Sequence, residues 1–227
     1  MKVIKTSTEA LGAESAGEIS KLVSRKPGCV LALSAAPQLK GLYAALAGTG
    51  ADFSGCSVVL TEEFLPPDAG HSRLASLKTM LAPAGFDCSR IYSPSAVEGG
   101  CAEFDAAIDS LGGIDLAVLA IGENGRIAFN EPLAAFDSPT HESKLTESAL
   151  SEECPGDASA PARGVTLGIH TLMRARRVLL AAYGSARAEA VHRAAEGRAH
   201  ISVPASLMQL HLNACLYADS GAASLLG

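Results

Sequence analysis

The stretch Asp115–Pro132, DLAVLAIGENGRIAFNEP, decides the fold of this chain. Its first part, Leu116–Ile121, has no polar side chain, is too short to span a membrane and lacks the alternation of a half-exposed strand. This pattern predicts a strand that is buried on both faces of a parallel sheet. Ligands of such sheets bind beyond the carboxyl ends of the strands. The loop Gly122–Gly125, followed by Arg126 and Glu131, is therefore a candidate site, although a simple turn that closes a core strand fits the spacing equally well.

Composition indicates one compact domain over residues 1–227. The chain has 227 residues, of which 48% are hydrophobic and 19% are charged, and no low-complexity segment interrupts it. This length and this apolar fraction suit a single full core. The net charge is −6 and no basic cluster has interleaved aromatic residues, so we expect no nucleic-acid partner.

Cysteine spacing and hydropathy indicate the compartment. The six cysteines show no C-x-x-C spacing, and the N-terminus has no secretory signal pattern. We therefore expect a cytoplasmic protein with reduced thiols, among which Cys29, Cys56 and Cys215 act as small buried hydrophobic residues. No apolar stretch reaches the roughly 18 residues of a membrane span, so no membrane partner is expected. No His, Cys or acidic pair has ligand spacing within a candidate site, and we expect neither a metal nor a cofactor.

Strands and helices alternate along the chain. The hydrophobic pattern predicts strands at 3–4, 29–33, 57–60, 116–121, 175–184 and 212–217, and helices at 8–25, from 37 onward, 72–83, around 104–111 and 185–197. Residues 136–161 show no periodicity, which is typical of a lid or a disordered loop. The alternation predicts an α/β fold in which a mostly parallel sheet is doubly wound.

The segment 122–132, GENGRIAFNEP, resembles the signature of the glucosamine-6-phosphate deaminase/isomerase family, whose usual form is G-x-D-G-H-I-A-F-N-E-P. Gly122, Gly125 and all six residues of Ile127–Pro132 match. The related 6-phosphogluconolactonases share the D-G-H core but continue differently. Asn124 stands where the family has an aspartate, and Arg126 where it has the ring-opening histidine. The resemblance implies the family's fold and makes these two positions candidate catalytic residues that depart from the family pattern.

Two earlier segments also resemble the family. The residues Ser34, Ala35 and Ala36 stand in a loop similar to its phosphate loop, S-G-G-S/T-T/S-P, but only Ser34 matches. The resemblance implies that backbone N–H groups of this loop bind substrate, while an ordinary strand-to-helix turn with Pro37 in the first helical position fits equally well. Thr61–Phe64 resembles the D-E-Y segment.

By that alignment Glu62 occupies the position of the aspartate that takes the C2 proton of the sugar. Its extra methylene moves the carboxylate by more than about 1 Å, which can cost about a hundredfold in rate. Without the resemblance, adjacent glutamates such as Glu62 and Glu63 are typical of a solvated surface.

The C-terminal half completes the resemblance. Thr166–Thr171 is similar to the family's T-x-G-x-x-T strand end, with His170 in the place of a small residue, and Arg187 stands where a phosphate-binding lysine is common. A cation in the first turn of a helix is unfavourable for the helix dipole, so Arg187 is either an anion ligand or a surface residue. The run 174–178, RARRV, is closer to the lactonases. His211 lies in a segment similar to V-P-A-S-x-L-Q-L-H, and we expect it to be structural.

Three functions are compatible with these residues. The first is an aldose/ketose isomerase or deaminase for an amino-sugar phosphate, with Glu62 as base and Glu131 as orienting carboxylate. Its activity is expected to be divergent or reduced, because the guanidinium of Arg126 stays protonated and cannot serve as the acid; His170 is a candidate replacement. The others are a non-catalytic sugar or sugar-phosphate binding protein and a lactonase-type hydrolase. All three imply a small-molecule sugar ligand, and the sequence is compatible with a homo-oligomer.

Overall fold

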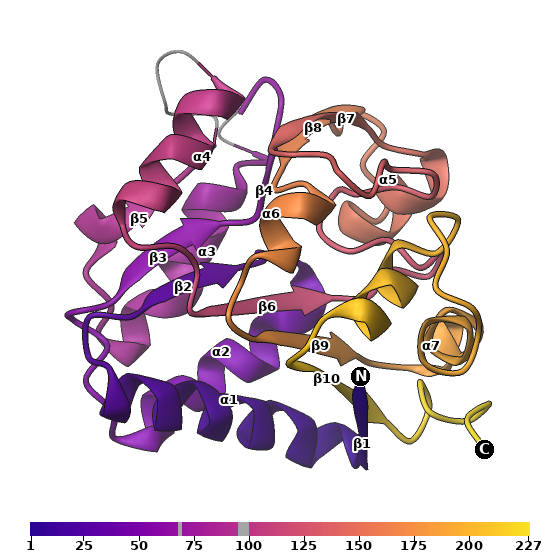
Figure 1. The fold of residues 1–227 in the computed structure, drawn as a ribbon, viewed down its shortest axis with the longest axis horizontal. Coiled ribbons are helices and arrows are strands. Elements are labelled where there is room, and N and C mark those ends of the chain that lie inside the picture. Colours follow the sequence, from indigo (N-terminus) through magenta and orange to yellow (C-terminus); the bar gives the residue numbers. More distant parts are fainter. Residues whose placement is uncertain (68–69, 95–99) are drawn as a thin grey trace.

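The computed structural model describes residues 1–67, 70–94 and 100–227. Its centre is a seven-stranded sheet of order β1-β10-β9-β6-β2-β3-β5, and every pairing in it is parallel. These strands are β1 (Lys2–Thr6), β2 (Val30–Leu33), β3 (Ser57–Leu60), β5 (Ile91–Tyr92), β6 (Leu116–Ala120), β9 (Val178–Ala182) and β10 (Ala214–Asp219). Strand β6, from the stretch that decides the fold, lies in the middle between β9 and β2 (Figure 1).

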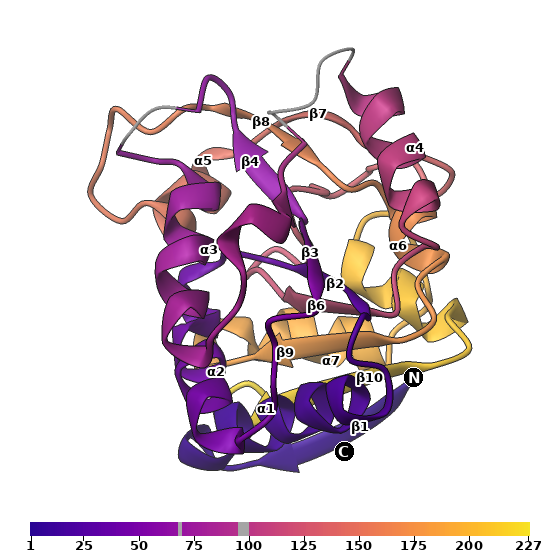
Figure 2. The ribbon, with the colours of Figure 1, turned by 90° about the vertical axis from the view of Figure 1, so that its left-hand side faces the viewer.

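Helices cover both faces of this sheet, which confirms the predicted doubly wound α/β class. The helices α1 (Thr8–Arg25), α2 (Lys40–Leu46) and α3 (Arg73–Leu81) pack on one face, and α4 (Cys101–Ser110), α6 (Ile169–Met173) and α7 (Ala188–Ala195) pack on the other. Figure 2 shows α2 and α3 on one side of the sheet and α4 and α6 on the opposite side. None of the helices in the described ranges combines the length and the hydrophobicity needed to cross a bilayer.

The two faces explain why the central strands have no polar positions. Successive side chains of a strand point to opposite faces. In β2, Leu31 and Leu33 contribute to the core beneath α1 and α2, whereas Val30 and Ala32 contribute to the core beneath α4 and α7. Each position is therefore buried whichever face it points to, and an uninterrupted apolar run results.

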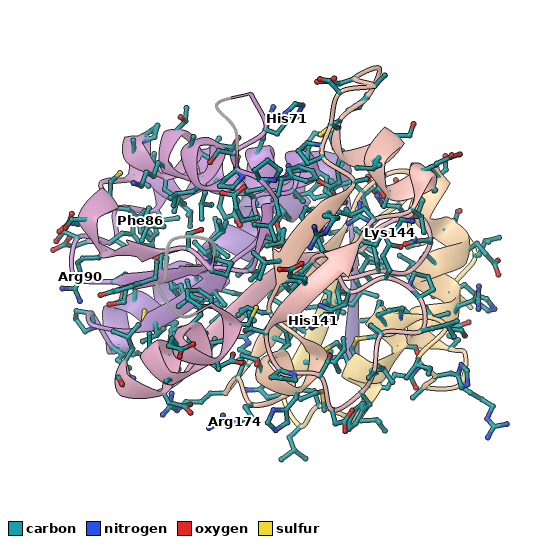
Figure 3. The ribbon with its side chains drawn as sticks, turned by 90° about the horizontal axis from the view of Figure 1, so that it is seen from above. His71, Phe86, Arg90, His141, Lys144 and Arg174 are labelled. Atoms are coloured by element: carbon teal, nitrogen blue, oxygen red, sulfur yellow. The ribbon has the colours of Figure 1, made fainter. Side chains whose placement is uncertain are left out.

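A second, antiparallel sheet of order β4-β8-β7 lies over the carboxyl ends of the first. It consists of β4 (Glu62–Phe64), β7 (His141–Lys144) and β8 (Arg163–Thr166). Strand β4 follows β3 after a single residue, so the chain leaves the large sheet and enters the small one at Thr61. Seen from above, β7 runs between the labelled His141 and Lys144 on the outside of the molecule (Figure 3).

The structure corrects the prediction for residues 136–161. That segment contains β7 and a short helix, α5 (Glu147–Glu153), whose first N–H groups are capped by Thr146. The alternation in His141–Lys144 is too short, and its residues too polar, for the hydrophobic pattern to reveal an edge strand. Helix α5 rests on a separate small core of Phe64, Phe129, Leu145 and Ala149, which the sequence places far apart.

Candidate active site

Glu62 is bound into the loop that follows β2. Its Oε1 accepts hydrogen bonds from Ser34 Oγ at 2.7 Å and from the N–H of Ala35 at 2.9 Å, and its Oε2 accepts one from Thr61 Oγ1. The side chain is 1% exposed. Burial raises the pKa of Glu62 to about 7, although the hydrogen bonds from Thr61 and Ser34 act in the opposite direction. The structure thus places at this position a carboxyl group that exchanges its proton near neutral pH.

The loop predicted to bind phosphate has its donors directed at Glu62 instead. The N–H of Ala35 and the hydroxyl of Ser34 both donate to that carboxylate, and the N–H of Ala36 donates to Ser34 Oγ at 3.2 Å. Pro37, which begins a turn leading into α2, has no N–H to offer. The extra methylene of Glu62 explains the arrangement, because it lets the carboxylate reach into the loop.

Both glutamates of β4 are buried, so the alternative of a solvated surface pair is wrong. Glu63 accepts hydrogen bonds from the N–H groups of Phe64 at 3.0 Å, Arg73 at 2.7 Å and Leu74 at 2.9 Å. The last two belong to the first turn of α3, where N–H groups have no acceptor within the helix, so Glu63 fixes that helix to β4. Its role is structural, while the carboxylate of Glu62 points to the candidate site.

The signature loop after β6 holds Asn124, Arg126 and Glu131 together. Asn124 Nδ2 donates to Glu131 Oε2 at 2.7 Å, and its Oδ1 accepts from the N–H of Arg126 at 3.0 Å. Gly125 has φ of 85°, a left-handed conformation that favours glycine, and an added Cβ would lie 2.7 Å from Val203 Cγ1. Gln38 Nε2 donates to the carbonyl of Ile121 at 3.3 Å and so ties the Ser34 loop to the end of β6.

Arg126 is buried in a network of ion pairs with α5. Its Nη2 donates to Glu152 Oε2 at 2.9 Å and to Glu153 Oε1, and its Nη1 donates to the carbonyl of Ala128 at 3.1 Å. Burial lowers the pKa of Arg126, but Glu153 and Glu152 outweigh this effect and raise that pKa above its ordinary value. The guanidinium is therefore a fixed cation and has no proton to give to a substrate.

Two further arginines complete this network. Arg187 Nη2 donates to Glu152 Oε1, and its Nη1 donates to the carbonyl of Tyr183 at 2.9 Å. Arg73 forms an ion pair with Glu153, donates through Nη1 to the carbonyl of Ala35 at 3.2 Å, and lies 4.8 Å from the centre of the Phe64 ring. The chain of charges Arg187, Glu152, Arg126, Glu153 and Arg73 thus runs from the start of α7 to the Ser34 loop.

His170 is not part of this arrangement. The resemblance places it at a strand end and makes it a candidate on the condition that this end faces the loop, but β8 ends at Thr166 and His170 lies on the exposed side of α6. Its backbone N–H donates to the carbonyl of Ser138 at 3.0 Å. The prediction that His170 replaces the missing acid is therefore wrong, because His170 does not lie at the site. The residue that closes the signature loop at this point is Thr166, whose hydroxyl accepts from the N–H of Phe129 at 3.2 Å.

His211 is structural, as predicted. Its Nδ1 accepts from the N–H of Asn213 at 3.0 Å, and its Nε2 lies 2.8 Å from the carbonyl of Ala175. This pairing requires the neutral tautomer with the proton on Nε2. The cysteines Cys29, Cys56 and Cys215 are buried and free, also as predicted.

Sequence analysis missed four residues that complete the site. Arg73, Thr146, Glu152 and Glu153 all contact residues that the sequence selected. Thr146 Oγ1 lies 3.3 Å from Glu131 Oε2, so the site is contacted by the N-cap of α5 and again by the last two residues of that helix. The one available signal was Thr146-Glu147, a helix-start pattern within the segment predicted to be irregular.

Comparison with known proteins agrees with this geometry. The family model described as glucosamine-6-phosphate isomerases/6-phosphogluconolactonase matches residues 5–216. A glucosamine-6-phosphate deaminase of Geobacillus sp. (strain WCH70) is 33% identical over all of this chain and 96% of the relative. One of Rhodopirellula baltica is 34% identical over 96% of this chain and 92% of the relative.

Solved structures extend the comparison to the fold. A monomeric glucosamine-6-phosphate deaminase superimposes with a TM-score of 0.93 at 30% identity, covering 99% of this chain and all of the other. The 6-phosphogluconolactonase from Trypanosoma brucei superimposes with a TM-score of 0.79 at 16% identity, and this second likeness concerns the fold alone. The chain belongs to the family of glucosamine-6-phosphate isomerases and 6-phosphogluconolactonases, on its deaminase/isomerase side.

Proposed function

We propose that this protein moves a proton between adjacent carbons of an open-chain amino-sugar phosphate, as a deaminase or aldose/ketose isomerase, more slowly than its deaminase relatives. The observation that supports this most is Glu62, a buried carboxyl group with a pKa of about 7 at the first position of β4, two residues after the end of β3. A general base works best when its pKa lies near the operating pH. Relatives named glucosamine-6-phosphate deaminase give the substrate class.

The reaction divides into steps that this chain supports unequally. As a carboxylate, Glu62 takes the C2 proton, and the electrons of the C–H bond form a C1=C2 double bond while the aldehyde oxygen gains a proton. Return of the proton to C1 leaves a C2 iminium, and water then replaces ammonia to give the ketose. Opening of the sugar ring needs an acid beforehand, and Arg126 cannot supply it because its guanidinium stays protonated. Ring opening is therefore the slow step in this proposal.

An analogue that cannot close its ring separates the two steps. 5-Deoxyfructose 6-phosphate lacks the hydroxyl that forms the furanose, so deuterium uptake at C1 in D₂O that contains an ammonium salt, the source of the C2 iminium in the reverse direction, reports proton transfer without ring opening. We expect uptake that Glu62→Gln abolishes and that the exposed control Glu147→Gln leaves unchanged. Ammonia release from glucosamine 6-phosphate should be about a thousandfold or more slower than in a deaminase relative, since a missing general acid costs about 10²–10⁴ in rate.

Two other outcomes would overturn the proposal. Ammonia release at the rate of the relative, abolished by Glu62→Gln, would show that the altered site is fully catalytic. Binding of the analogue without deuterium uptake would favour a non-catalytic sugar-phosphate binding protein, a function that the ion-paired state of Arg126 also suits. Hydrolysis of 6-phosphogluconolactone, measured in the same series, tests the lactonase alternative.

A further inference from the structure

The end of α5 closes the candidate active site. Glu62 is 1% exposed and Arg126 is 3% exposed, so neither group is open to a sugar in this structure. Glu152 and Glu153 of α5 pair with Arg126, and Glu153 also pairs with Arg73, which donates to the carbonyl of Ala35 in the Ser34 loop. An anionic ligand of Arg126 therefore has to displace these carboxylates of α5.

The carboxylate of Glu152 sits in a complete anion site. Its Oε2 accepts from Arg126 Nη2 at 2.9 Å and from the backbone N–H of Glu123 at 3.1 Å, and its Oε1 accepts from Arg187 Nη2. Two guanidinium groups and a main-chain N–H around one carboxylate form the charge-assisted arrangement that proteins use for carboxylates and phosphates. Helix α5 supplies the anion, whereas the signature loop and the start of α7 supply all three donors.

The carboxylates of Glu152 and Glu153 leave some N–H donors of the surrounding arginines without an acceptor. Within the described part of the chain, Nε of Arg126 and Nε of Arg73 have no hydrogen-bond acceptor, although both side chains are at most 5% exposed. A carboxylate has two oxygens, and those of Glu152 and Glu153 are already shared among three arginines. A phosphate monoester brings three acceptor oxygens and up to two negative charges, so it matches this donor set better than the resident carboxylate does.

Helix α5 is short enough to be displaced. It has seven residues, of which only Ala149 and Glu153 are buried, and it rests on the small core around Phe64 and Phe129 rather than on the main sheet. Isolated helices of this length are unstable in water, so α5 depends on its contacts. Segments with few buried apolar contacts open at low free-energy cost.

We propose that Glu152 is an internal competitor: its carboxylate occupies an anion site formed by Arg126, Arg187 and the Glu123 N–H, and the phosphate of a sugar phosphate binds by displacing it. The proposal rests on the proposed function only for the identity of the ligand as a sugar phosphate. It predicts that a site with two arginines has a low affinity for phosphate while Glu152 occupies it. It also makes Glu152 the residue that decides how much a phosphate group adds to binding.

Calorimetric titration with inorganic phosphate tests this without any turnover. Glu152→Gln keeps the shape of the side chain and removes its charge, so phosphate should bind about ten- to a hundredfold more tightly than to the wild type, the value of one charge-assisted hydrogen bond. Arg187→Ala in the Glu152→Gln background should abolish the gain. Glu147→Gln removes an exposed charge from the same helix and should change the affinity by less than about twofold by charge screening.

Glucosamine 6-phosphate and glucosamine, titrated in parallel, show whether the gain is confined to the phosphate ester. A folded Glu152→Gln protein whose phosphate affinity equals that of the wild type overturns the proposal.

Hydrogen exchange of the wild-type protein tests the displacement of α5 independently of any variant. The amides of α5 should exchange faster as phosphate is added, and unchanged or slower exchange throughout the titration contradicts displacement. Failure of deuterium uptake in the analogue would refute the proposed catalysis but would leave these binding results as they are.

Discussion

One methylene group separates the candidate base of this protein from the aspartate of its family's pattern. That added length carries the Glu62 carboxylate into the Ser34 loop, where it takes the hydroxyl of Ser34 and the N–H of Ala35. The departure at Glu62 therefore acts directly on the loop, whose Ser34 hydroxyl and Ala35 N–H it occupies. We therefore expect a 6-phosphate to add little to binding at this loop, because the donors there are already used.

The paired departures at Asn124 and Arg126 lead to a prediction about activity. Asn124→Asp alone would place a second carboxylate at 2.7 Å from Glu131, an unfavourable contact between like charges. Arg126→His in addition supplies a group that can be a cation beside them and can release its proton near neutral pH. We expect the double variant to recover part of the ammonia release from glucosamine 6-phosphate, and Asn124→Asp alone to recover none, in a coupled ammonia assay.

The same double variant should be less stable than the wild type. Loss of the guanidinium leaves Glu152 and Glu153 with one arginine each, and breaking a buried ion pair costs about 3–5 kcal/mol. Glu153→Gln added to the variant should restore part of the free energy of unfolding in urea. A double variant as active as its single Asn124→Asp parent, yet stably folded, would show that Arg126 is not the reason for slow ring opening.

At the scale of elements, β4 and α3 are held together by one carboxylate. Glu63 accepts from Phe64, Arg73 and Leu74 N–H groups and from Ser72 Oγ at 3.2 Å. Glu63→Gln offers only one acceptor oxygen and turns an NH₂ group toward N–H donors. We expect the free energy of unfolding to fall by about 1.5–3 kcal/mol, the value of hydrogen bonds to a charged group. Urea denaturation should show no comparable loss for Glu147→Gln, and equal stability of the two variants would refute this role.

At the scale of the whole molecule, Glu62 makes folding depend on pH. Its pKa is about 7 in the folded protein against an ordinary value of 4.5, so the folded state binds the proton more tightly than the unfolded state. The resulting stabilisation is complete below about pH 4.5 and is lost as the pH rises through about 7. At about 1.4 kcal/mol for each pKa unit, the loss amounts to about 3 kcal/mol.

Glu62→Gln should remove this dependence. Between pH 5 and pH 8, the stability of Glu62→Gln relative to the wild type should rise by up to about 3 kcal/mol, measured by urea denaturation at each pH. Glu147→Gln, an exposed change of the same kind, should run parallel to the wild type. A Glu62→Gln curve that also runs parallel would mean that Glu62 is ionised throughout this range in the folded protein.

The sequence by itself determined the fold class and most of the central sheet. Apolar runs such as Leu116–Ile121 and the helical spacing in Thr8–Arg25 are local patterns, and they found β6 and α1 almost to the residue. The resemblance of residues 122–132 located the signature loop and, with Glu62 and Ser34, selected residues that the structure does bring together. These elements are set by burial along the chain, which periodicity reports directly.

Only the tertiary structure decided what those residues are bonded to. Glu152 and Glu153 reach Arg126 from α5, and Arg73 of α3 pairs with Glu153; no periodic signal links positions so far apart in the chain. His170, which the sequence had placed at the site, lies outside it because β8 ends four residues earlier and His170 is on the exposed side of α6. Ion pairs between distant segments depend on charge and on three-dimensional proximity, and the short polar elements that create them leave almost no hydrophobic pattern in the sequence.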